Sequence, residues 1–287
     1  MNCEIQMGGD SLSISIQADH GLGFAPLHRL TQRGPMQHGS TDVGFRLDPR
    51  IFTLAIPLRE TSMSDLYDAR QQLMTWLTPG ADVSLLFTLA NGEERQIDCS
   101  LIEAPMDHDV TQVWSAQVVP LRFYAPDPCF YDPTTESVSF GLDPGAYAFT
   151  IPLGVPVGVG PSDIDQTVNL TYEGNFRSYP WRLRIEGPIT DPVITNVTTD
   201  EKFDFTGVTI ADGDHYDIDC RYGQKGVEDA SGTNKVDELT SDSDLATFHL
   251  APHPEATDGI NEINVTGSAV TSDTEVYMIA PVRYLGI

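Results

Sequence analysis

Lysine is nearly absent from this chain: three of its 287 residues are lysine, while 42 are aspartate or glutamate, and the formal net charge is −26. A surface this acidic is repelled by nucleic acid and by the anionic face of a membrane, so we expect neither as a direct partner. The acidic excess lies mainly in the second half of the chain. The scarcity of lysine and the abundance of aspartate resemble the composition of proteins from salt-loving organisms.

This halophilic composition makes a prediction about salt. If the fold depends on screening of its acidic surface, it loosens when salt is removed. The melting temperature should therefore fall when the salt concentration is lowered from molar to millimolar. An unchanged melting temperature would remove the halophilic hypothesis.

The sequence also lacks the common signatures of catalysis and metal binding. It contains no G-x-S-x-G nucleophile elbow, no G-x-x-x-x-G-K-[ST] phosphate loop and no H-E-x-x-H zinc motif. The four cysteines form no C-x-x-C pair, so we expect free buried thiols: Cys3, Cys99, Cys129 and Cys220. Nothing in this inventory demands catalysis, so we expect no enzymatic activity, no cofactor and no metal.

No apolar run approaches the length of a membrane-spanning helix. The N-terminus has no basic segment followed by an apolar core, so no signal peptide is expected. Abundant glycine and proline, 24 and 20 residues, favour short strands and turns over long helices.

The first half predicts strands around a single helix. Residues 64–77 predict the helix, because Ser62 and Asp65 have capping-box spacing, Ser64 is a competing N-cap, and apolar residues recur on one face. Asn91-Gly92 predicts a hairpin turn. Residues 33–44 are glycine-rich and polar, which predicts a long loop or a protruding arm. Strands are predicted over residues 12–18, 27–32, 50–58, 83–89, 95–102 and 110–122.

The second half predicts a β-sandwich. Residues 134–167 form an extended, Gly/Pro-rich connection with one or two strands. Short strand patterns separated by turns follow, as in sandwich folds: residues 168–173, 180–186, 193–198, 202–205, 209–210, 215–221, 245–250, 262–266 and 275–284.

Residues 121–133 join the two halves. This stretch contains three prolines and four aromatic residues, and each proline also restricts the residue before it. We therefore predict a stiff, extended strap that is neither a helix nor a central strand. Its junction residues are Phe123, Tyr124, Pro126, Asp127, Pro128, Phe130 and Tyr131. The predicted domains are residues 1–133 and 134–287.

Two candidate ligand sites remain open at this point. Four acids in eight residues form a candidate Ca²⁺ loop: Asp212, Asp214, Asp217 and Asp219. We favour a turn followed by a strand with an acidic outer face, because the EF-hand spacing is absent. Position 223, the twelfth from Asp212, is glycine, whereas an EF-hand loop needs glutamate there. Trp181, Tyr172 and Tyr179 could stack on a sugar ring, although aromatic residues on alternating strands more often belong to the core.

The order and spacing of these features resemble the distal tail proteins of long-tailed bacteriophages. In the first half the resemblance rests on Arg50-Ile-Phe-Thr-Leu, on the helix ending in Thr-Pro-Gly, on the strand pair around Asn91-Gly92 and on the junction. In the second half it rests on Gly174-Asn175, Asp191-Pro-Val-Ile-Thr-Asn, His215-Tyr-Asp-Ile-Asp and Val282-Arg-Tyr-Leu.

The resemblance implies a mainly β fold, with an N-terminal split-barrel belt domain containing one α-helix and a C-terminal galectin-like β-sandwich. It implies a virion protein of the tail tip, or baseplate, made in the host cytoplasm, here in a virus of a halophilic host. Six copies would form a ring between the tail tube protein and the tail hub or tape-measure protein, and would dock receptor-binding or fibre proteins for host attachment.

In that ring we expect the arm to cross to a neighbouring subunit, through Arg33, Gly34, Pro35, Met36, Gln37, His38 and Gly39. The alternative function is a carbohydrate-binding β-sandwich that attaches to host glycans, with or without Ca²⁺. A tail-associated glycosidase is a third, less favoured hypothesis.

Overall fold

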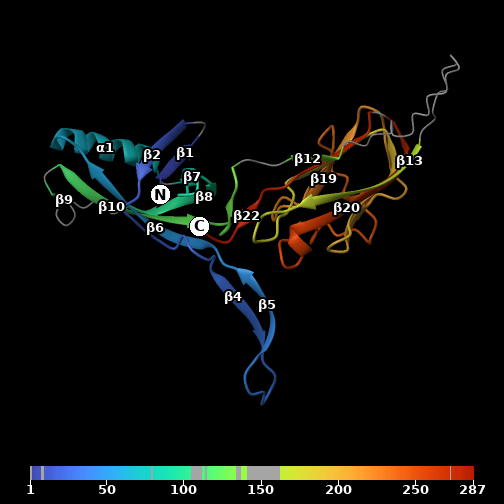
Figure 1. The fold of residues 1–287 in the computed structure, drawn as a ribbon, viewed down its shortest axis with the longest axis horizontal. Coiled ribbons are helices and arrows are strands. Elements are labelled where there is room, and N and C mark those ends of the chain that lie inside the picture. The colour runs from blue at the N-terminus through green and yellow to red at the C-terminus, as the bar shows by residue number, and fades with distance from the viewer. Residues whose placement is uncertain are drawn as a thin grey trace. The chain divides into compact units, whose positions relative to one another are not determined.

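Strands dominate the fold, which confirms the mainly β prediction. The structure is a computed structural model that describes residues 2–7, 10–78, 80–104, 112–113, 115–133, 137–140, 162–271 and 273–287. The chain divides into two compact units (Figure 1). The first unit comprises Met1–Pro133 together with Tyr284–Ile287, and the second comprises Thr134–Arg283. Residues 284–287, which the sequence analysis left with the second domain, thus belong to the first unit.

The first unit is built on an open antiparallel sheet. Its path begins at β2 (Asp10–Ser15) and continues through β1 (Asn2–Met7), β7 (Asp82–Thr88), β8 (Glu94–Glu103), β10 (Ala116–Ala125) and β6 (Arg50–Arg59) to β3 (Ala18–His20). Two short strands, β9 (Gln112–Val113) and β11 (Phe130–Tyr131), pair with β10 and β8 respectively. Among the described residues this sheet does not close into a barrel, because β2 and β3 form its two ends.

Alternating apolar residues form the core of this unit. Along β6 the buried positions alternate with partly exposed ones, as expected for a sheet with one covered face. Phe52 of β6 stacks on Phe123 of β10 with ring centroids 5.4 Å apart, and Phe87 meets Phe130 edge to face at 5.9 Å. Trp114, within the strand predicted over residues 110–122, lies outside the described residues.

The helix α1 (Met63–Trp76) lies one residue before the predicted range of 64–77 at each end. Ser62 is the N-cap, and its hydroxyl accepts a hydrogen bond from the backbone N–H of Asp65 at 3.2 Å. The side chain of Asp65 in turn accepts a hydrogen bond from Thr61 at 2.7 Å, and hydrogen bonds to this carboxyl from Thr61 and then Ser62 lower its pKa. The helix lies beside β6 and buries Leu66 and Leu73, of which Leu73 belongs to the core of this unit. No helix in the described residues is both long enough and apolar enough to cross a membrane.

The second unit contains two five-stranded sheets that share one core. One sheet has the order β12 (Ser137–Phe140), β21 (Glu275–Ile279), β14 (Arg182–Glu186), β18 (His215–Asp219) and β19 (Gly226–Asp229). The other has β13 (Ser162–Thr171), β20 (Ile260–Val270), β15 (Ile189–Asn196) and β16 (Glu201–Asp204), with β17 (Thr209–Ile210) beside β15. Buried residues from both sheets, such as Ile185, Ile194 and Val265, form a single apolar cluster, as in a β-sandwich.

Two sequence predictions about strands were wrong. Residues 121–125 are not a strap but the end of β10, which lies between β6 and β8. Proline restricts the residue before it to extended conformations, and those conformations suit a strand, so Pro126 ends β10 without disturbing it. Residues 245–250 form turns rather than a strand, and their one strand-like contact is an isolated bridge from Leu250 to Ser178.

Most of the Gly/Pro-rich connection, residues 134–167, lies outside the described residues. From this stretch the structure describes β12 and the first residues of β13. Two further 3-10 turns, η2 (Val236–Glu238) and η3 (Thr257–Gly259), lie in the loops of the second unit.

Candidate assembly surface

The segment predicted as an arm is a two-stranded β-hairpin. β4 (Leu27–Gln32) and β5 (Thr41–Leu47) pair antiparallel in a sheet of their own, which projects away from the main sheet of the first unit (Figure 1). The predicted loop therefore shortens to residues 33–40, because residues 41–44 belong to β5. We call residues 27–47 the arm.

The arm exposes apolar side chains along its whole length. Met36 at the tip is 99% exposed, Val43 is 63% exposed and Phe45 is 54% exposed. Leu27 and Leu30 of β4 are also exposed. An isolated two-stranded hairpin is marginally stable in water, and its outer edges leave backbone hydrogen-bonding groups unpaired. Both features are typical of a segment that another protein chain covers.

The tip of the arm is held by its own hydrogen bonds. The backbone N–H of Gly34 donates to Gln37 Oε1 at 2.8 Å, and the guanidinium of Arg33 donates to the Gln37 carbonyl at 3.2 Å. Met36 has a φ of 63°, in the left-handed region, so the tip turns sharply there. Every tip residue from Arg33 to Gly39 except the partly buried Gln37 is exposed, so these side chains are available to a partner.

The junction residues surround a buried arginine that sequence analysis missed. Arg50 has no exposed surface, and its guanidinium donates to four backbone carbonyls. The acceptors are Pro128 at 2.8 Å and Gly21, Gly23 and Leu285, each at 2.7 Å. Phe130 lies under the guanidinium at 4.9 Å from the ring centroid. Burial lowers the pKa of Arg50 from its usual value.

The same junction receives the last residues of the chain. Tyr284 stacks on the guanidinium of Arg95 at 3.6 Å, and β22 (Arg283–Tyr284) pairs with β11. The backbone N–H of Ile287 donates to the Leu22 carbonyl at 3.2 Å. The C-terminal segment therefore completes the first unit.

The other junction residues separate by exposure. Phe123 and Phe130 are buried in the core, whereas Tyr124 is exposed on the opposite face of β10. Asp127 Oδ1 accepts a hydrogen bond from the Cys129 N–H at 3.1 Å, which shapes the turn between Pro126 and Pro128. The Tyr131 hydroxyl donates to Asp98 at 2.6 Å, and burial raises the pKa of Tyr131.

The candidate Ca²⁺ loop is a turn followed by a strand with a charged outer face. Asp212 lies in the turn, and β18 alternates buried and partly exposed residues. Arg184 forms a two-bonded ion pair with Asp217 at 2.6 and 2.7 Å, and Arg221 contacts Asp219 at 2.6 Å. Burial opposes ionisation of Asp217, but Arg184 outweighs it, and the pKa of Asp217 falls. Within the described residues no three acidic, histidine or cysteine side chains are placed to hold a metal ion. Arg184 and Arg221 pair with two of the four candidate carboxylates, those of Asp217 and Asp219.

The three candidate sugar-stacking residues are not brought together on one surface. Tyr172 is buried in the sandwich core, and its hydroxyl donates to the Phe176 carbonyl at 2.6 Å. Trp181 is half-buried. Tyr179 packs edge to face against Tyr222, with ring centroids 4.9 Å apart.

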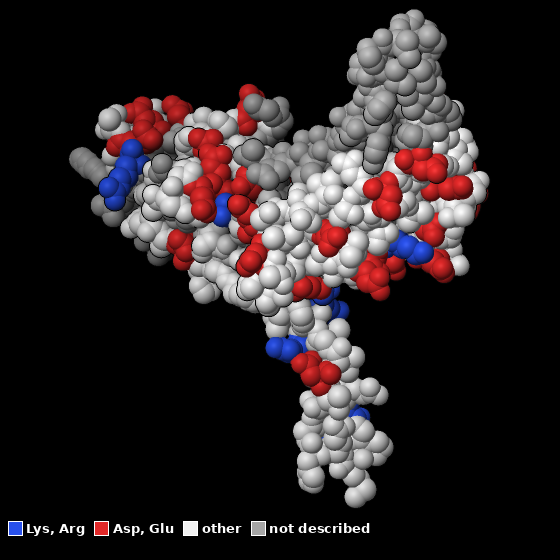
Figure 2. Space-filling model, turned by 45° about the vertical axis from the view of Figure 1, so that its right-hand side comes forward, with Lys and Arg blue, Asp and Glu red and all other residues white. Residues whose placement is uncertain are grey.

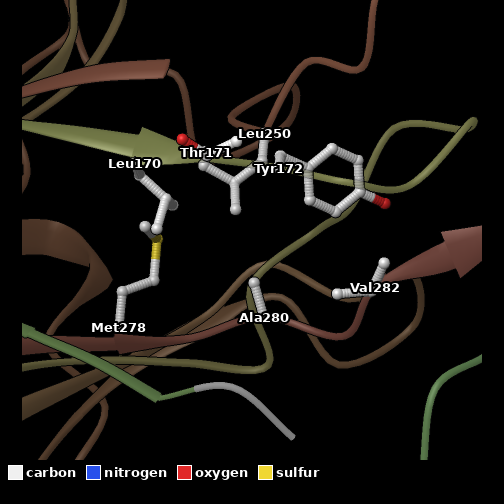
Figure 3. A pocket seen from close by; sticks show the side chains of 7 residues that line it. All are labelled: Leu170, Thr171, Tyr172, Leu250, Met278, Ala280 and Val282. Atoms are coloured by element: carbon white, nitrogen blue, oxygen red, sulfur yellow. The ribbon is translucent and has the colours of Figure 1, made fainter. Parts of the chain in front are cut away.

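A small cavity lies inside the sandwich (Figure 3). Its volume is about 20 Å³, which is room for a single water molecule. The cavity is lined by Leu170, Thr171, Tyr172, Leu250, Met278, Ala280 and Val282. These side chains are almost all apolar, and the Tyr172 hydroxyl points away from the other labelled side chains (Figure 3). This cavity is a packing gap of the core and is too small for a sugar ring.

His249 is a buried ion-pairing group that no motif in the sequence marks. It is 5% exposed, and its Nδ1 lies 2.9 Å from Glu201 Oε2. Its Nε2 has no hydrogen-bond partner among the described residues and lies 3.5 Å from Glu255, whose carboxylate forms a two-bonded ion pair with Arg177. Burial lowers the pKa of His249, but the hydrogen bonds to Glu201 and to the Thr247 carbonyl outweigh burial, and the net pKa is raised.

This raised pKa predicts that the second unit is more stable in mild acid. The contribution of His249 is fully present below its unfolded pKa, near 6.5, and is lost as pH rises through the higher folded pKa. The free energy of unfolding of this unit should fall as the pH rises from about 6.5 through the raised pKa of His249. His249→Gln should flatten that dependence in urea titrations at several pH values. The same slope in both proteins would show that other groups cause it.

Comparison with known proteins finds similarity to phage tail proteins, in sequence over part of the chain and in fold over nearly all of it. Residues 10–120 match the model of the family described as the phage tail protein RIFT-related domain. The crystal structure of Dit from phage SPP1, described as a paradigm of the hub adsorption apparatus in phages that infect Gram-positive hosts, has the same fold. It aligns with a TM-score of 0.61 and 13% identity over 98% of each chain. The resemblance to siphovirus distal tail proteins predicted from the sequence is thus confirmed.

A weaker similarity extends to the activated baseplate of phage p2 determined with Sr. That match has a TM-score of 0.46 and 9% identity and covers 97% of each chain. A sequence search of the curated proteins finds no match.

Proposed function

We propose that this chain is a structural component of a viral tail, a distal tail adaptor that assembles into a homohexameric ring. The ring would join the tail tube protein to the tail hub or tape-measure protein and would dock receptor-binding or fibre proteins. The fold shared with SPP1 Dit over nearly the whole chain supports this proposal. The single observation that carries the assembly step is the arm, a projecting hairpin with exposed apolar side chains.

The position of the arm on the chain favours assembly into a closed ring. The arm and the surface that receives it are different patches of the same chain, so a contact between them is head-to-tail, and head-to-tail contacts close into rings when the rotation permits. A chain that works through such interfaces needs no catalytic centre, and we propose no enzymatic activity for it. The residues proposed to cross between subunits remain Arg33 to Gly39.

The location in the virion can be tested directly. Antibodies raised against the purified chain should label the tail, at its tip, in electron micrographs of the virions that encode it. Labelling confined to capsids, or none on intact and detergent-opened virions alike, would contradict the proposal. An antibody against the tail tube protein serves as the positive control.

A second candidate function is glycan binding by the second unit. One observation favours it: Tyr222 is 71% exposed and lies beside Tyr179, and the Lys225 amine sits 4.5 Å from the Tyr222 ring centroid. Exposed aromatic rings next to a hydrogen-bond donor can stack on a sugar. In this case a host-surface polysaccharide should bind the wild-type chain and bind Tyr222→Ala at least tenfold more weakly. Equal binding, or none, would remove this candidate.

A further inference from the structure

The arm reverses the charge of the chain around it. Residues 27–47 contain three arginines, Arg29, Arg33 and Arg46, and one acid, Asp42, whereas the whole chain carries a net charge of −26. In Figure 2 the projecting hairpin carries blue groups and one red patch, while red groups outnumber blue on the visible faces of both units. A basic segment on an acidic protein is attracted to a second copy of that protein.

The arm keeps part of its positive charge unpaired. Arg29 pairs with Asp42 at 2.7 Å, and Arg46 lies 3.3 Å from Asp48 at the base of the arm. Arg33 at the tip donates to the Gln37 carbonyl, and among the described residues it has no carboxylate within ion-pair distance. The tip therefore presents an arginine beside the fully exposed Met36.

A surface of opposite charge lies on the outer face of β1, β2 and β7. An open groove of about 520 Å³ is lined there by Glu4, Gln6, Met7, Asp10, Ser11, Asp82 and Ser84. No lysine or arginine occurs in residues 1–28 or 71–94, the parts of the chain that contain these strands. This surface thus has no lysine or arginine on its own strands to balance its carboxylates.

The edge of the main sheet beside this groove is also free to pair with another strand. β2 ends the strand order of the main sheet, so in the described part of the chain its outer edge is unpaired. The outer edges of β4 and β5 are likewise unpaired among the described residues, and an exposed strand edge commonly takes up a strand of another chain. The groove contains one apolar side chain, Met7, which can contact the exposed Met36.

We infer that the acidic groove of β1, β2 and β7 in one copy receives the basic arm of the next copy. This inference rests on the proposed function, because it names the partner surface of the arm in the ring. Arg33 would meet Glu4, Asp10 or Asp82 of the neighbouring copy, and Met36 would lie beside Met7. The contact is heterologous, as ring closure requires.

Cysteine cross-linking tests the contact itself. The four native cysteines are buried, and burial raises the pKa of the Cys3 thiol to about 12, so they give little background. Chains with Met36→Cys are mixed with chains with Ser11→Cys and mildly oxidised. We expect covalent dimers between the two kinds of chain. Cross-links to Tyr67→Cys on α1 in place of Ser11→Cys would put the arm on the helix and overturn the inference.

Charge reversal tests the complementarity. Arg33→Glu should weaken assembly at least about tenfold, and adding Glu4→Arg and Asp10→Arg to the same chain should restore it, because each copy supplies both an arm and a groove. Arg221→Glu, at an exposed position of the second unit, is the matched control and should assemble as the wild type does. Circular dichroism checks that each variant is folded.

The outcomes separate the inference from the proposed function. Wild-type rings that tolerate Arg33→Glu and give no Met36–Ser11 cross-link would overturn the arm–groove contact and leave the ring intact. A wild-type chain that forms no oligomer at any concentration or salt would contradict the proposed ring, and the inference with it.

Discussion

Arg50→Met is expected to lower the free energy of unfolding of the first unit by at least about 3 kcal/mol. The guanidinium makes four hydrogen bonds to carbonyls that come from three separate segments, residues 21–23, 128 and 285. Methionine has a similar length but no donor, so these buried carbonyls would lose their partner. Urea unfolding followed by far-ultraviolet circular dichroism measures the change.

Two variants make that prediction specific. Arg50→Lys keeps the charge but cannot present a planar fork of donors to four acceptors, so we expect an intermediate loss. Arg122→Met, at an exposed arginine of β10, should change the free energy by less than about 0.5 kcal/mol. If Arg50→Met is as stable as Arg122→Met, the carbonyls find other partners and Arg50 does not hold the junction together.

Removing the arm is expected to abolish assembly and to leave the fold intact. Leu27 and Leu47 are paired across the base of the hairpin, so an Asn-Gly turn can replace residues 28–46. The deleted residues are almost all exposed and contribute little to the core of the first unit. We expect a change in unfolding free energy of less than about 1 kcal/mol and the complete loss of ring-sized particles in analytical ultracentrifugation.

A milder variant tests whether the exposed apolar side chains of the arm, rather than its length, drive assembly. Val43→Ser with Phe45→Ser and Met36→Ser keeps the hairpin but removes its largest exposed apolar groups, and it should weaken assembly without preventing it. Rings formed equally well by the arm-deleted chain would show that another part of the first unit joins the subunits.

Local signals in the sequence predicted local structure well. Ser62 three residues before Asp65 predicted the helix start, and the Ser62 hydroxyl does cap the Asp65 N–H. Asn91-Gly92 predicted the hairpin between β7 and β8, where the Gly92 N–H closes the turn onto the Leu89 carbonyl at 3.0 Å. These features depend on residues only a few positions apart, so a pattern in the sequence contains all that is needed.

Features that depend on distant contacts were missed. Arg50 is bonded to a carbonyl 235 positions away, and no local pattern marks an arginine whose partners are backbone atoms. The alternation of residues 245–250 suggested a strand, but hydrogen bonds from Thr247 and Phe248 to Asp244 hold this stretch in turns. The acidic run around β18 left a Ca²⁺ loop open as the less favoured alternative to a turn and a strand, because the sequence does not show that Arg184 of the neighbouring strand lies opposite Asp217.

The mass and shape of the purified chain test the central claim most directly. Measurement in high salt is preferred, because each copy carries a net charge of −26 and salt screens the repulsion between copies. Light scattering should give the mass of six copies, and negative-stain images should show six-fold rings. A particle of one copy at every concentration and salt, with no rings in the images, would contradict the proposed adaptor.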